Sequence, residues 1–235
     1  MSTTRGRPRR NPISPTRLGA RQDILHAAGG LFVERGFGQT STRAIAEAAG
    51  LQQASVYHWF ASKDEILLSL VLGTVEPSRT VADHLAALDE PGAVLLWALA
   101  FADTTLLQSD RQNLGVLYFE PELGSERFRG FHDNRNALLE AYAAMLERAT
   151  GRPTADVDVT MTIGLVESVI MHRRRTRLDL PPETPTRIAD AVLVLAGIPE
   201  LLSEETRRGG RALVDPLLAA GADRPGRDGD DRERA

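Results

Sequence analysis

Apolar residues recur at helical spacing along most of the chain. In the first such segment, residues 17–35, the residues that share one face are Ile24, Ala28, Leu31 and Phe32. Proline and glycine separate further helical segments, which we expect near 78–89, 91–109, 124–150, 155–177, 184–198 and 203–221. No segment shows the strict alternation that is typical of a half-buried strand. The pattern therefore predicts an all-α fold.

Residues 40–50 predict a short helix that ends in a sharp turn. Thr40 or Ser41 caps its start, because a hydroxyl there can accept from a free backbone N–H of the first turn. The small Ala46 allows a second helix to approach closely, and Gly50 permits the positive φ of a tight corner. Leu51 then fills the angle between the two helices.

A second short helix is predicted from about Gln53. It buries Val56 and either Trp59 or Phe60, and we expect both of these aromatic rings to belong to the core. Two short helices joined by a glycine corner are typical of a helix-turn-helix, whose second helix enters the DNA major groove. A three-helix core that binds nothing is the alternative.

The next helix is expected to begin at Ser62. Ser62-Lys63-Asp64-Glu65 fits a capping box, in which the Ser62 and Glu65 side chains satisfy each other's backbone N–H groups. Pro77 is expected to stop or kink this helix, because proline lacks the N–H donor and clashes with the preceding turn. Residues 63–77 would then join a head to a body and act as the lever between them.

Residues 21–70 resemble the DNA-binding domain of the TetR (tetracycline-repressor) family of bacterial regulators. The resemblance is carried by Arg21-Gln22-Asp23-Ile24-Leu25, Leu31-Phe32, Arg35-Gly36-Phe37, Thr40-Ser41, Ile45-Ala46, Ala49-Gly50-Leu51, Val56-Tyr57-His58-Trp59-Phe60 and Ser62-Lys63. It implies that a helical ligand-binding domain follows the DNA-binding head.

Charge is divided along the chain. Residues 1–75 carry a net charge of +4, and residues 76–235 carry −8. A basic head on an acidic body suggests that one end meets a polyanion. We expect four regions: a flexible basic arm over 1–16, the helix-turn-helix domain over 17–75, a helical ligand-binding and dimerisation domain over 76–222, and a disordered tail over 223–235.

Candidate DNA contacts lie in the head and the arm. Gln52 and Gln53 start the second short helix, where their amides can reach base edges, preferably adenine. Arg5-Gly6-Arg7-Pro8 suits the narrow, strongly negative minor groove of AT-rich DNA, although such an arm can also act through general charge attraction. The full candidate set is Arg5, Arg7, Thr40, Ser41, Thr42, Arg43, Gln52, Gln53, Ser55, Tyr57, His58 and Lys63. Tyr57 and His58 are included because they resemble family positions that touch the DNA backbone.

Two late segments, 155–177 and 184–198, are apolar on more faces than a surface helix needs. Part of that surface should meet a second copy of the chain, and two helices from each copy would form a four-helix bundle across a two-fold axis. A homodimer would present two recognition helices to a palindromic DNA operator. Complete burial of both helices within one chain is the alternative.

The body is also expected to bind a small-molecule effector. The segment from Ala93 to Leu107 is apolar on nearly every side and predicts a central helix, on which Asp103 needs a partner or a polar ligand. Candidate pocket residues are Trp97, Phe101, Asp103, Tyr118, Phe119, Phe128, Met161 and Leu165. For each aromatic residue of this set, the alternative is an ordinary position in the hydrophobic core.

The composition excludes several classes. The chain has no cysteine, so disulfides and thiol catalysis are ruled out, and a reducing cytoplasm fits. No catalytic motif, cofactor-binding loop or metal-ligand spacing is present, and the longest apolar run is about half of the roughly 20 residues that span a membrane. We therefore expect a transcriptional regulator, a repressor released by its effector, with neither enzymatic activity nor a membrane partner. An architectural DNA-binding protein that depends on its arm is the alternative.

Overall fold

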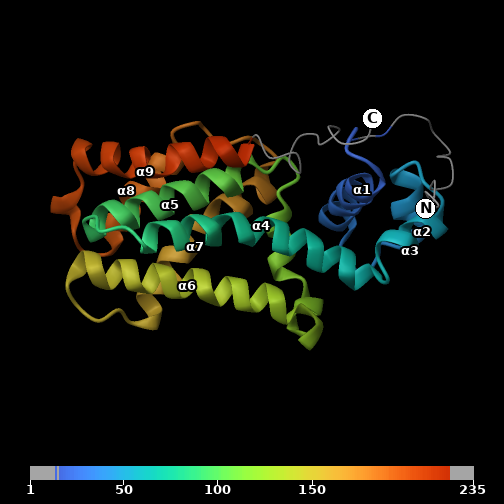
Figure 1. The fold of residues 1–235 in the computed structure, drawn as a ribbon, viewed down its shortest axis with the longest axis horizontal. Coiled ribbons are helices and arrows are strands. Elements are labelled where there is room, and N and C mark those ends of the chain that lie inside the picture. Colours follow the sequence, from blue (N-terminus) through green and yellow to red (C-terminus); the bar gives the residue numbers. More distant parts are fainter. Residues whose placement is uncertain (1–13, 15, 223–235) are drawn as a thin grey trace, which may run out of the picture.

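The computed structural model describes residue 14 and residues 16–222, and within them every regular element is a helix, which confirms the predicted all-α class. The head is built from α1 (Ala20–Arg35), α2 (Thr42–Ala48) and α3 (Gln53–Trp59). The long helix α4 (Lys63–Ala86) starts in the head and runs into the body, as Figure 1 shows.

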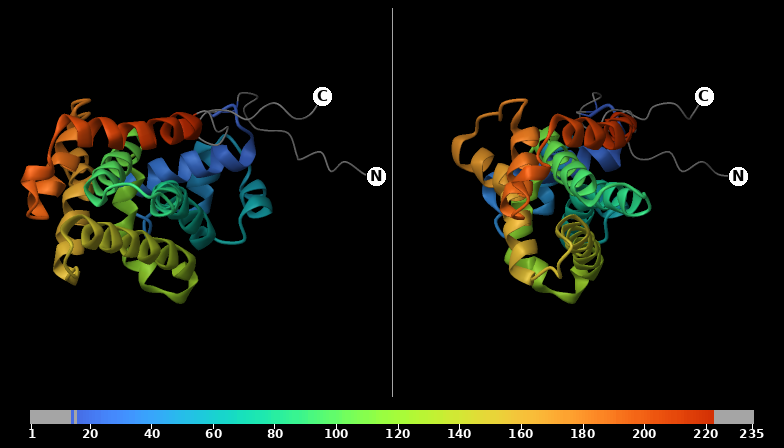
Figure 2. Two further views of the ribbon diagram at one scale, coloured as in Figure 1. Left: turned by 60° about the vertical axis from the view of Figure 1, so that its left-hand side comes forward. Right: turned by 90° about the vertical axis from the view of Figure 1, so that its left-hand side faces the viewer.

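In the described part of the body, α4 and four later helices pack around a central one. The elements are α5 (Gly92–Ser109), three short 3₁₀ turns η1 (Leu114–Phe119), η2 (Pro121–Gly124) and η3 (Glu126–Phe128), then α6 (Arg129–Thr150), α7 (Asp156–Thr176), α8 (Thr184–Leu195), η4 (Pro199–Leu201) and α9 (Glu204–Ala222). The helix predicted near 124–150 therefore begins later, because 3₁₀ turns occupy the residues up to Phe128. In both views of Figure 2, α5 (green) lies between α9 (red) and α6 (yellow).

Helix α5 is the centre of the body core, as its apolar sequence predicted. Most of its side chains are buried, including Leu96, Trp97 and Leu99. By length and composition alone α5 is apolar enough to cross a membrane, but 72% of it is buried within the protein. Packing in the core of the body is therefore enough to explain why α5 is so hydrophobic.

Pro77 does not stop its helix. Helix α4 continues past it to Ala86, so the helix predicted near 78–89 is the second half of α4. Of the two expected outcomes, a stop or a kink, the stop is wrong. A proline inside a helix removes one backbone donor, but tertiary contacts can still hold the turns on both sides. The residue four positions earlier is the exposed Gly73, so water can reach the carbonyl that loses its donor.

Consecutive glycines in α1 let the head rest closely on the body. A Cβ atom at Gly29 would lie 2.8 Å from both Gln112 Oε1 and Leu114 Cδ2. The Gln112 amide donates to the His26 carbonyl at 2.8 Å. Glycine in a helix costs about 1 kcal/mol relative to alanine, and this close contact with the loop before η1 is the packing that offsets the cost.

The turn after α1 also joins head and body. Gly36 has φ +86° and ψ 155°, a positive φ that favours glycine. Phe32 and Phe37 contact each other across this turn, with ring centroids 5.1 Å apart. The backbone N–H of Phe37 donates to Glu120 Oε1 at 3.3 Å, which ties this turn to the segment after η1.

Candidate DNA-binding site

The corner between α2 and α3 has the predicted helix-turn-helix geometry. Of the two candidate caps, Ser41 caps α2, and its hydroxyl accepts from the Ala44 N–H at 3.1 Å. Gly50 has φ +67°, the left-handed conformation that favours glycine. The Leu51 N–H donates to the Ala46 carbonyl at 2.8 Å, and both side chains are buried in the angle.

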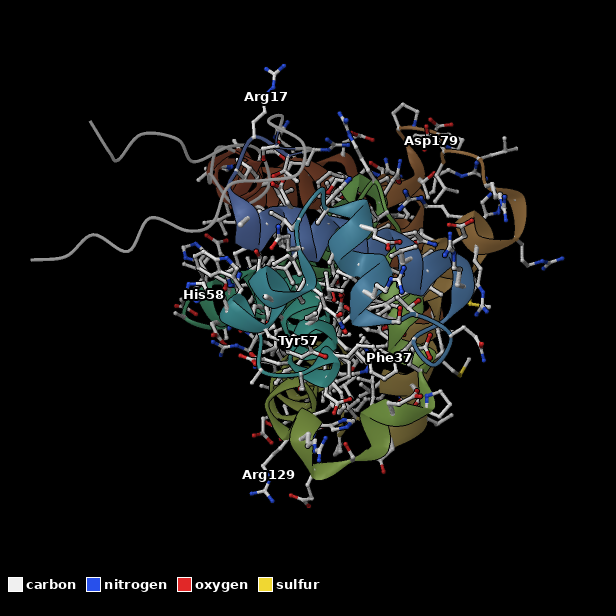
Figure 3. All side chains as sticks on the ribbon, turned by 90° about the vertical axis from the view of Figure 1, so that its right-hand side faces the viewer. Arg17, Phe37, Tyr57, His58, Arg129 and Asp179 are labelled. Atoms are coloured by element: carbon white, nitrogen blue, oxygen red, sulfur yellow. The ribbon has the colours of Figure 1, made fainter. Side chains whose placement is uncertain are left out.

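Helix α3 packs on the head through one side only. Val56 and the following Phe60 are buried, whereas the opposite side exposes Ala54 and His58. Figure 3, which faces the outer end of the head, shows Tyr57 and His58 there. The arrangement leaves a full helix face available to a partner.

Trp59 corrects one sequence expectation. It was assigned to the core with Phe60, but it is 45% exposed, and its ring meets His58 edge-on with centroids 5.4 Å apart. The reason is helical geometry: Phe60 follows one residue later, about 100° around the helix, and occupies the inward direction shared with Val56. Trp59 thereby belongs to the exposed surface of the helix-turn-helix and was missed as a candidate contact.

An exposed hydrogen-bond chain links α2 to α3. The Gln53 amide donates to Thr42 Oγ1 at 3.0 Å, and Thr42 Oγ1 lies 3.1 Å from the Tyr57 hydroxyl. Gln53 and Tyr57 are one turn apart on α3, so Thr42 holds both side chains from the neighbouring helix. Three of the sequence candidates therefore form one surface.

Two other candidates have internal partners. Thr40 is buried and donates its hydroxyl to the Gly36 carbonyl at 2.9 Å. The Lys63 ammonium donates to the carbonyls of Phe37 and Thr40 at 2.7 and 2.9 Å and lies 4.0 Å from the Phe37 ring centroid. These contacts stabilise the Lys63 ammonium at the N-terminus of α4, a position where the helix dipole alone disfavours a cation.

The remaining candidates differ in their surroundings. Arg43 is exposed and pairs with Glu47 at 3.1 Å along α2, a contact that water screens and DNA can replace. Gln52 is exposed at the start of α3, and Ser55 is half-buried. Arg5 and Arg7, together with nearly all of the predicted basic arm and the predicted C-terminal tail, lie outside the described residues.

The pocket candidates do not line one cavity. Trp97, Phe101 and Phe128 are buried core residues, while Tyr118 and Leu165 are half-buried at its edge. Phe119 and Met161 are exposed, so the expectation that they line an interior cavity is wrong. Met161 instead borders a depression of about 80 Å³ between α6, α7 and α8, which Leu195 also lines.

The Asp103 carboxylate is hydrogen-bonded to other side chains of the body. Its carboxylate accepts from the Ser78 hydroxyl at 2.7 Å and from the Tyr142 hydroxyl at 3.1 Å, which ties α5 to α4 and α6. Burial raises the pKa of Asp103 to about 6, although the Ser78 hydrogen bond acts in the opposite direction. Burial and the adjacent carboxylate also raise the pKa of Tyr142, so its phenol stays protonated.

Helices α7 and α8 expose an apolar face. The large apolar side chains on it and on the loop between the two helices are Val157, Met161, Met171, Leu178, Val194 and Leu195. Met161 is 49% exposed and Val194 53% exposed, far more than a core position allows. The alternative that one chain buries both helices completely is therefore wrong for the described residues.

The chain is similar in sequence and in fold to known bacterial proteins. Residues 24–70 match the family of bacterial regulatory proteins called the tetR family. The crystal structure of AmtR from Mycobacterium smegmatis is 37% identical, with a TM-score of 0.77 over 84% of this chain and 95% of AmtR. This chain belongs to the TetR family.

Two relatives from other bacteria are also named as HTH-type transcriptional regulators. The HTH-type transcriptional repressor KstR2 of Rhodococcus jostii is 28% identical over 149 residues, 61% of this chain and 72% of KstR2. The HTH-type regulator YdeS of Bacillus subtilis is 26% identical over 179 residues, 74% of this chain and 83% of YdeS. TetR-family proteins are cytoplasmic transcriptional regulators that bind DNA as homodimers and respond to small molecules. The chain is accordingly a helix-turn-helix DNA-binding transcriptional regulator.

Proposed function

We propose that the protein is a cytoplasmic homodimeric repressor that binds a palindromic operator and is released from it by a small-molecule effector. The observation that carries the proposal is the exposed face of α3, which begins directly after the Gly50 corner. An α-helix presented in this way fits the width of the major groove. Repression is supported by the similarity to the repressor KstR2.

The proposed base contacts come from the start of α3. Gln53 is exposed and already oriented by Thr42, so its amide needs little reordering to form a bidentate pair with adenine. Gln52 and Ser55 lie beside it, and Tyr57, His58 and Trp59 extend the surface toward the DNA backbone. We assign Ser41, Thr42 and Arg43 to phosphate contacts at the start of α2, where free N–H groups favour anions.

Thr40 and Lys63 act differently in this proposal. Their polar groups hold the turn between α1 and α2, so they position the phosphate-binding residues of α2. The third N–H of the Lys63 ammonium remains available to a phosphate. Arg5 and Arg7 are proposed to add minor-groove or general electrostatic contacts from the arm.

The apolar face of α7 and α8 is the proposed dimer interface. Pairing two such faces would bury the exposed Met161 and Val194 and form a four-helix bundle. The two recognition helices would then reach successive major grooves about 34 Å apart. A palindromic operator follows from this two-fold symmetry.

Effector release requires the body to change the spacing of the two heads. Helix α4 connects them directly, and the loop before η1 adds the Gln112 contact to α1. A ligand that favours a different arrangement of α4 or η1 would rotate the heads away from the operator spacing. The effector site is proposed to lie among the body helices, with Tyr118 and Leu165 at its edge.

The decisive experiment selects duplexes from random DNA with the full-length protein. We expect recovery of a palindrome whose half-sites are one helical turn apart, with binding that retains sequence preference at high salt. A Gln53→Ala variant should relax the preference at one base pair in each half-site. Binding that shows no sequence preference and collapses with rising salt would instead favour an arm-dependent architectural protein.

A further inference from the structure

The exposed face of α7 and α8 changes in character along its length. At one end, Met161 and Leu195 line a depression of about 80 Å³. At the other end, His172 and Arg187 line a depression of about 390 Å³ between the last turns of α7 and the start of α8. The two helices therefore run antiparallel, and the face that they share has an apolar end and a polar end.

Four exposed arginines lie at the polar end of this face, and we call them the arginine end: Arg174, Arg175, Arg177 and Arg187. Arg175 follows the exposed Met171 by one turn of α7, so both lie on the same side of that helix. Arg187 precedes the exposed Val194 by about two turns of α8. The arginines thus continue the apolar side of each helix.

The arginine end carries unbalanced positive charge. None of its four side chains has an ion-pair partner among the described residues, whereas Arg135 elsewhere in the body pairs with Glu167 at 2.6 Å. The loop between the two helices adds two exposed carboxylates, Asp179 and Glu183, so the four arginines leave a net charge of +2. Residues 76–235 as a whole carry −8, which makes this end a local exception.

Arg177 stands where the backbone favours glycine. It ends α7 with φ 55° and ψ 20°, and its N–H donates to the Arg173 carbonyl at 2.9 Å. This left-handed conformation is strained for a residue with a Cβ atom, and glycine is the usual residue there. The backbone gives no reason for an arginine at this position, and a contact made by its side chain would supply one.

The arginine end faces the same way as the DNA-binding head. The Asn113 amide donates to the Ile170 carbonyl at 3.0 Å, near the end of α7. Its neighbour Gln112 donates to the His26 carbonyl of α1. Figure 3, which looks onto the outer end of the head, shows Asp179 to one side of it. A two-fold axis that presents both heads to one operator keeps the head-facing ends of the two bodies together, so the arginine ends of the two copies meet.

We propose that the two arginine ends form, across the dimer axis, one binding site for a multivalent anion such as a diphosphate or a polycarboxylate. The inference rests on the proposed function, because it requires the dimer built on α7 and α8. Two positive ends that meet repel each other unless a counter-charge lies between them. A multivalent anion supplies that charge and can accept paired N–H donors from guanidinium groups of both copies. The depression beside Arg187 offers room for it.

Such an anion would act close to the heads. It would hold together the head-facing ends of α7 in the two copies, and the Asn113 and Gln112 contacts continue from there to α1. Its binding would therefore favour one spacing of the heads and change operator affinity. This route is separate from the effector site proposed near Tyr118 and Leu165.

The test titrates the full-length protein with inorganic pyrophosphate in a calorimeter, with sodium chloride holding the ionic strength constant. Arg175→Gln with Arg187→Gln removes one arginine from each helix of the face. Arg148→Gln with Arg208→Gln is the matched control, because these two arginines are also exposed but lie on α6 and α9. The dimer dissociation constant of each variant is measured by sedimentation in sodium chloride alone.

We expect saturable binding of one pyrophosphate for every two chains. The variant with Arg175→Gln and Arg187→Gln should bind it at least about tenfold more weakly, because charged hydrogen bonds are lost in both copies, and the control should match wild type. A monomeric chain, made by Met161→Asp with Val194→Asp, should lose binding although it keeps all four arginines. In sodium chloride the arginine variant should dimerise as well as wild type or better, since like charges leave the interface.

One pyrophosphate for each chain, or equal binding by the monomer, would place the site within a single copy and overturn the proposal. Weaker dimerisation of the arginine variant in sodium chloride would show that the arginines pair with carboxylates of the second copy, with the same consequence. No pyrophosphate binding, combined with a lower salt dependence of operator binding in that variant, would assign the arginines to DNA phosphates instead. A dimer that selects its operator but takes up no pyrophosphate overturns this inference alone, whereas a monomeric wild type overturns the proposed function as well.

Discussion

The head and the body of this regulator place their polar groups in opposite ways. In the head, Gln53, Thr42 and Tyr57 form a hydrogen-bond chain on the exposed surface. In the body, Asp103 and its hydroxyl partners are buried, while α7 and α8 turn apolar side chains outward. The contrast distinguishes the partners of the two surfaces: exposed, oriented polar groups suit nucleic acid, and an exposed apolar face suits another protein subunit.

The difference also explains why the effector is harder to identify than the DNA. A surface that meets DNA has to expose its hydrogen-bonding groups, and they can be recognised in the free protein. Interior polar groups satisfy one another, as Asp103 does with Ser78 and Tyr142, so their presence does not by itself indicate a ligand.

The largest effect is expected from making the apolar face polar. Met161→Asp with Val194→Asp places two carboxylates in the proposed dimer interface, where burial without a partner is costly. The particle mass should fall to that of a monomer in sedimentation analysis. Operator affinity should fall by about 10²- to 10⁴-fold, because the second half-site contact is no longer linked to the first. Asp replacements at the exposed Glu200 and Glu205 serve as a control that leaves the face intact. A variant that remains a dimer would place the interface elsewhere.

The second prediction concerns pH and the buried carboxylate. Asp103 has a pKa of about 6 in the folded protein and about 3.9 when unfolded, so between these values the folded chain keeps a proton that the unfolded chain loses. Stability should therefore fall as pH rises from about 4 to about 6, by about 1.4 kcal/mol per unit from this group and roughly 3 kcal/mol in total. Above pH 6 the contribution is lost and constant.

Urea unfolding followed by circular dichroism at pH 4, 5, 6 and 7 measures this slope. Asp103→Asn keeps the shape of the side chain but cannot ionise. The difference in stability between wild type and variant should therefore show the pH dependence that comes from Asp103. Parallel profiles for wild type and Asp103→Asn would contradict the buried, proton-binding role.

Sequence reasoning succeeded where a residue type has one physical use. Gly50 supplies the positive φ and Ala46 the small side chain, so these two residues were enough to predict the corner, while the cap was narrowed to Thr40 or Ser41 and is Ser41. Trp59 was misplaced because its neighbour Phe60 is equally apolar and only the exact helical direction separates them. Arrangement in three dimensions, not residue type, decides such cases.

In the body, too, residue type alone did not predict which way the side chains face. Its later helices were predicted near their observed positions, although the segment near 78–89 belongs to α4. Phe119 and Met161, however, were placed in a cavity and are exposed. Pro77 was expected to stop or kink α4, and the helix continues to Ala86. Sequence periodicity reports which residues are apolar, but it does not report whether the apolar face meets the core, a ligand or a second subunit.

The third prediction addresses the polar face of the head. Gln53→Ala should weaken operator binding by about 1–3 kcal/mol per half-site, the value of one bidentate amide–adenine pair. The loss should be confined to sequences that carry the preferred base. Thr42→Val removes the hydroxyl that orients Gln53 and also a proposed phosphate contact, so it should weaken binding to all sequences and, by a smaller amount than Gln53→Ala, reduce the preference at the same base pair. Equal weakening across all sequences would reassign Gln53 to a phosphate contact.

The smallest effect is expected where the head meets the body. Gly73→Ala on the exposed side of α4 should stabilise the protein by about 1 kcal/mol, because nothing lies within 4 Å of the added Cβ. Gly29→Ala gains the same helix propensity, but its Cβ displaces Gln112 and breaks the bond to His26, which is worth about 1 kcal/mol. The two should nearly cancel, so that chemical unfolding of Gly29→Ala matches wild type. Equal stabilisation by both alanines would show that the Gln112 contact adds no stability to the interface between head and body. In that case α4 and the Phe37–Glu120 contact would have to carry any effect of the body on the head.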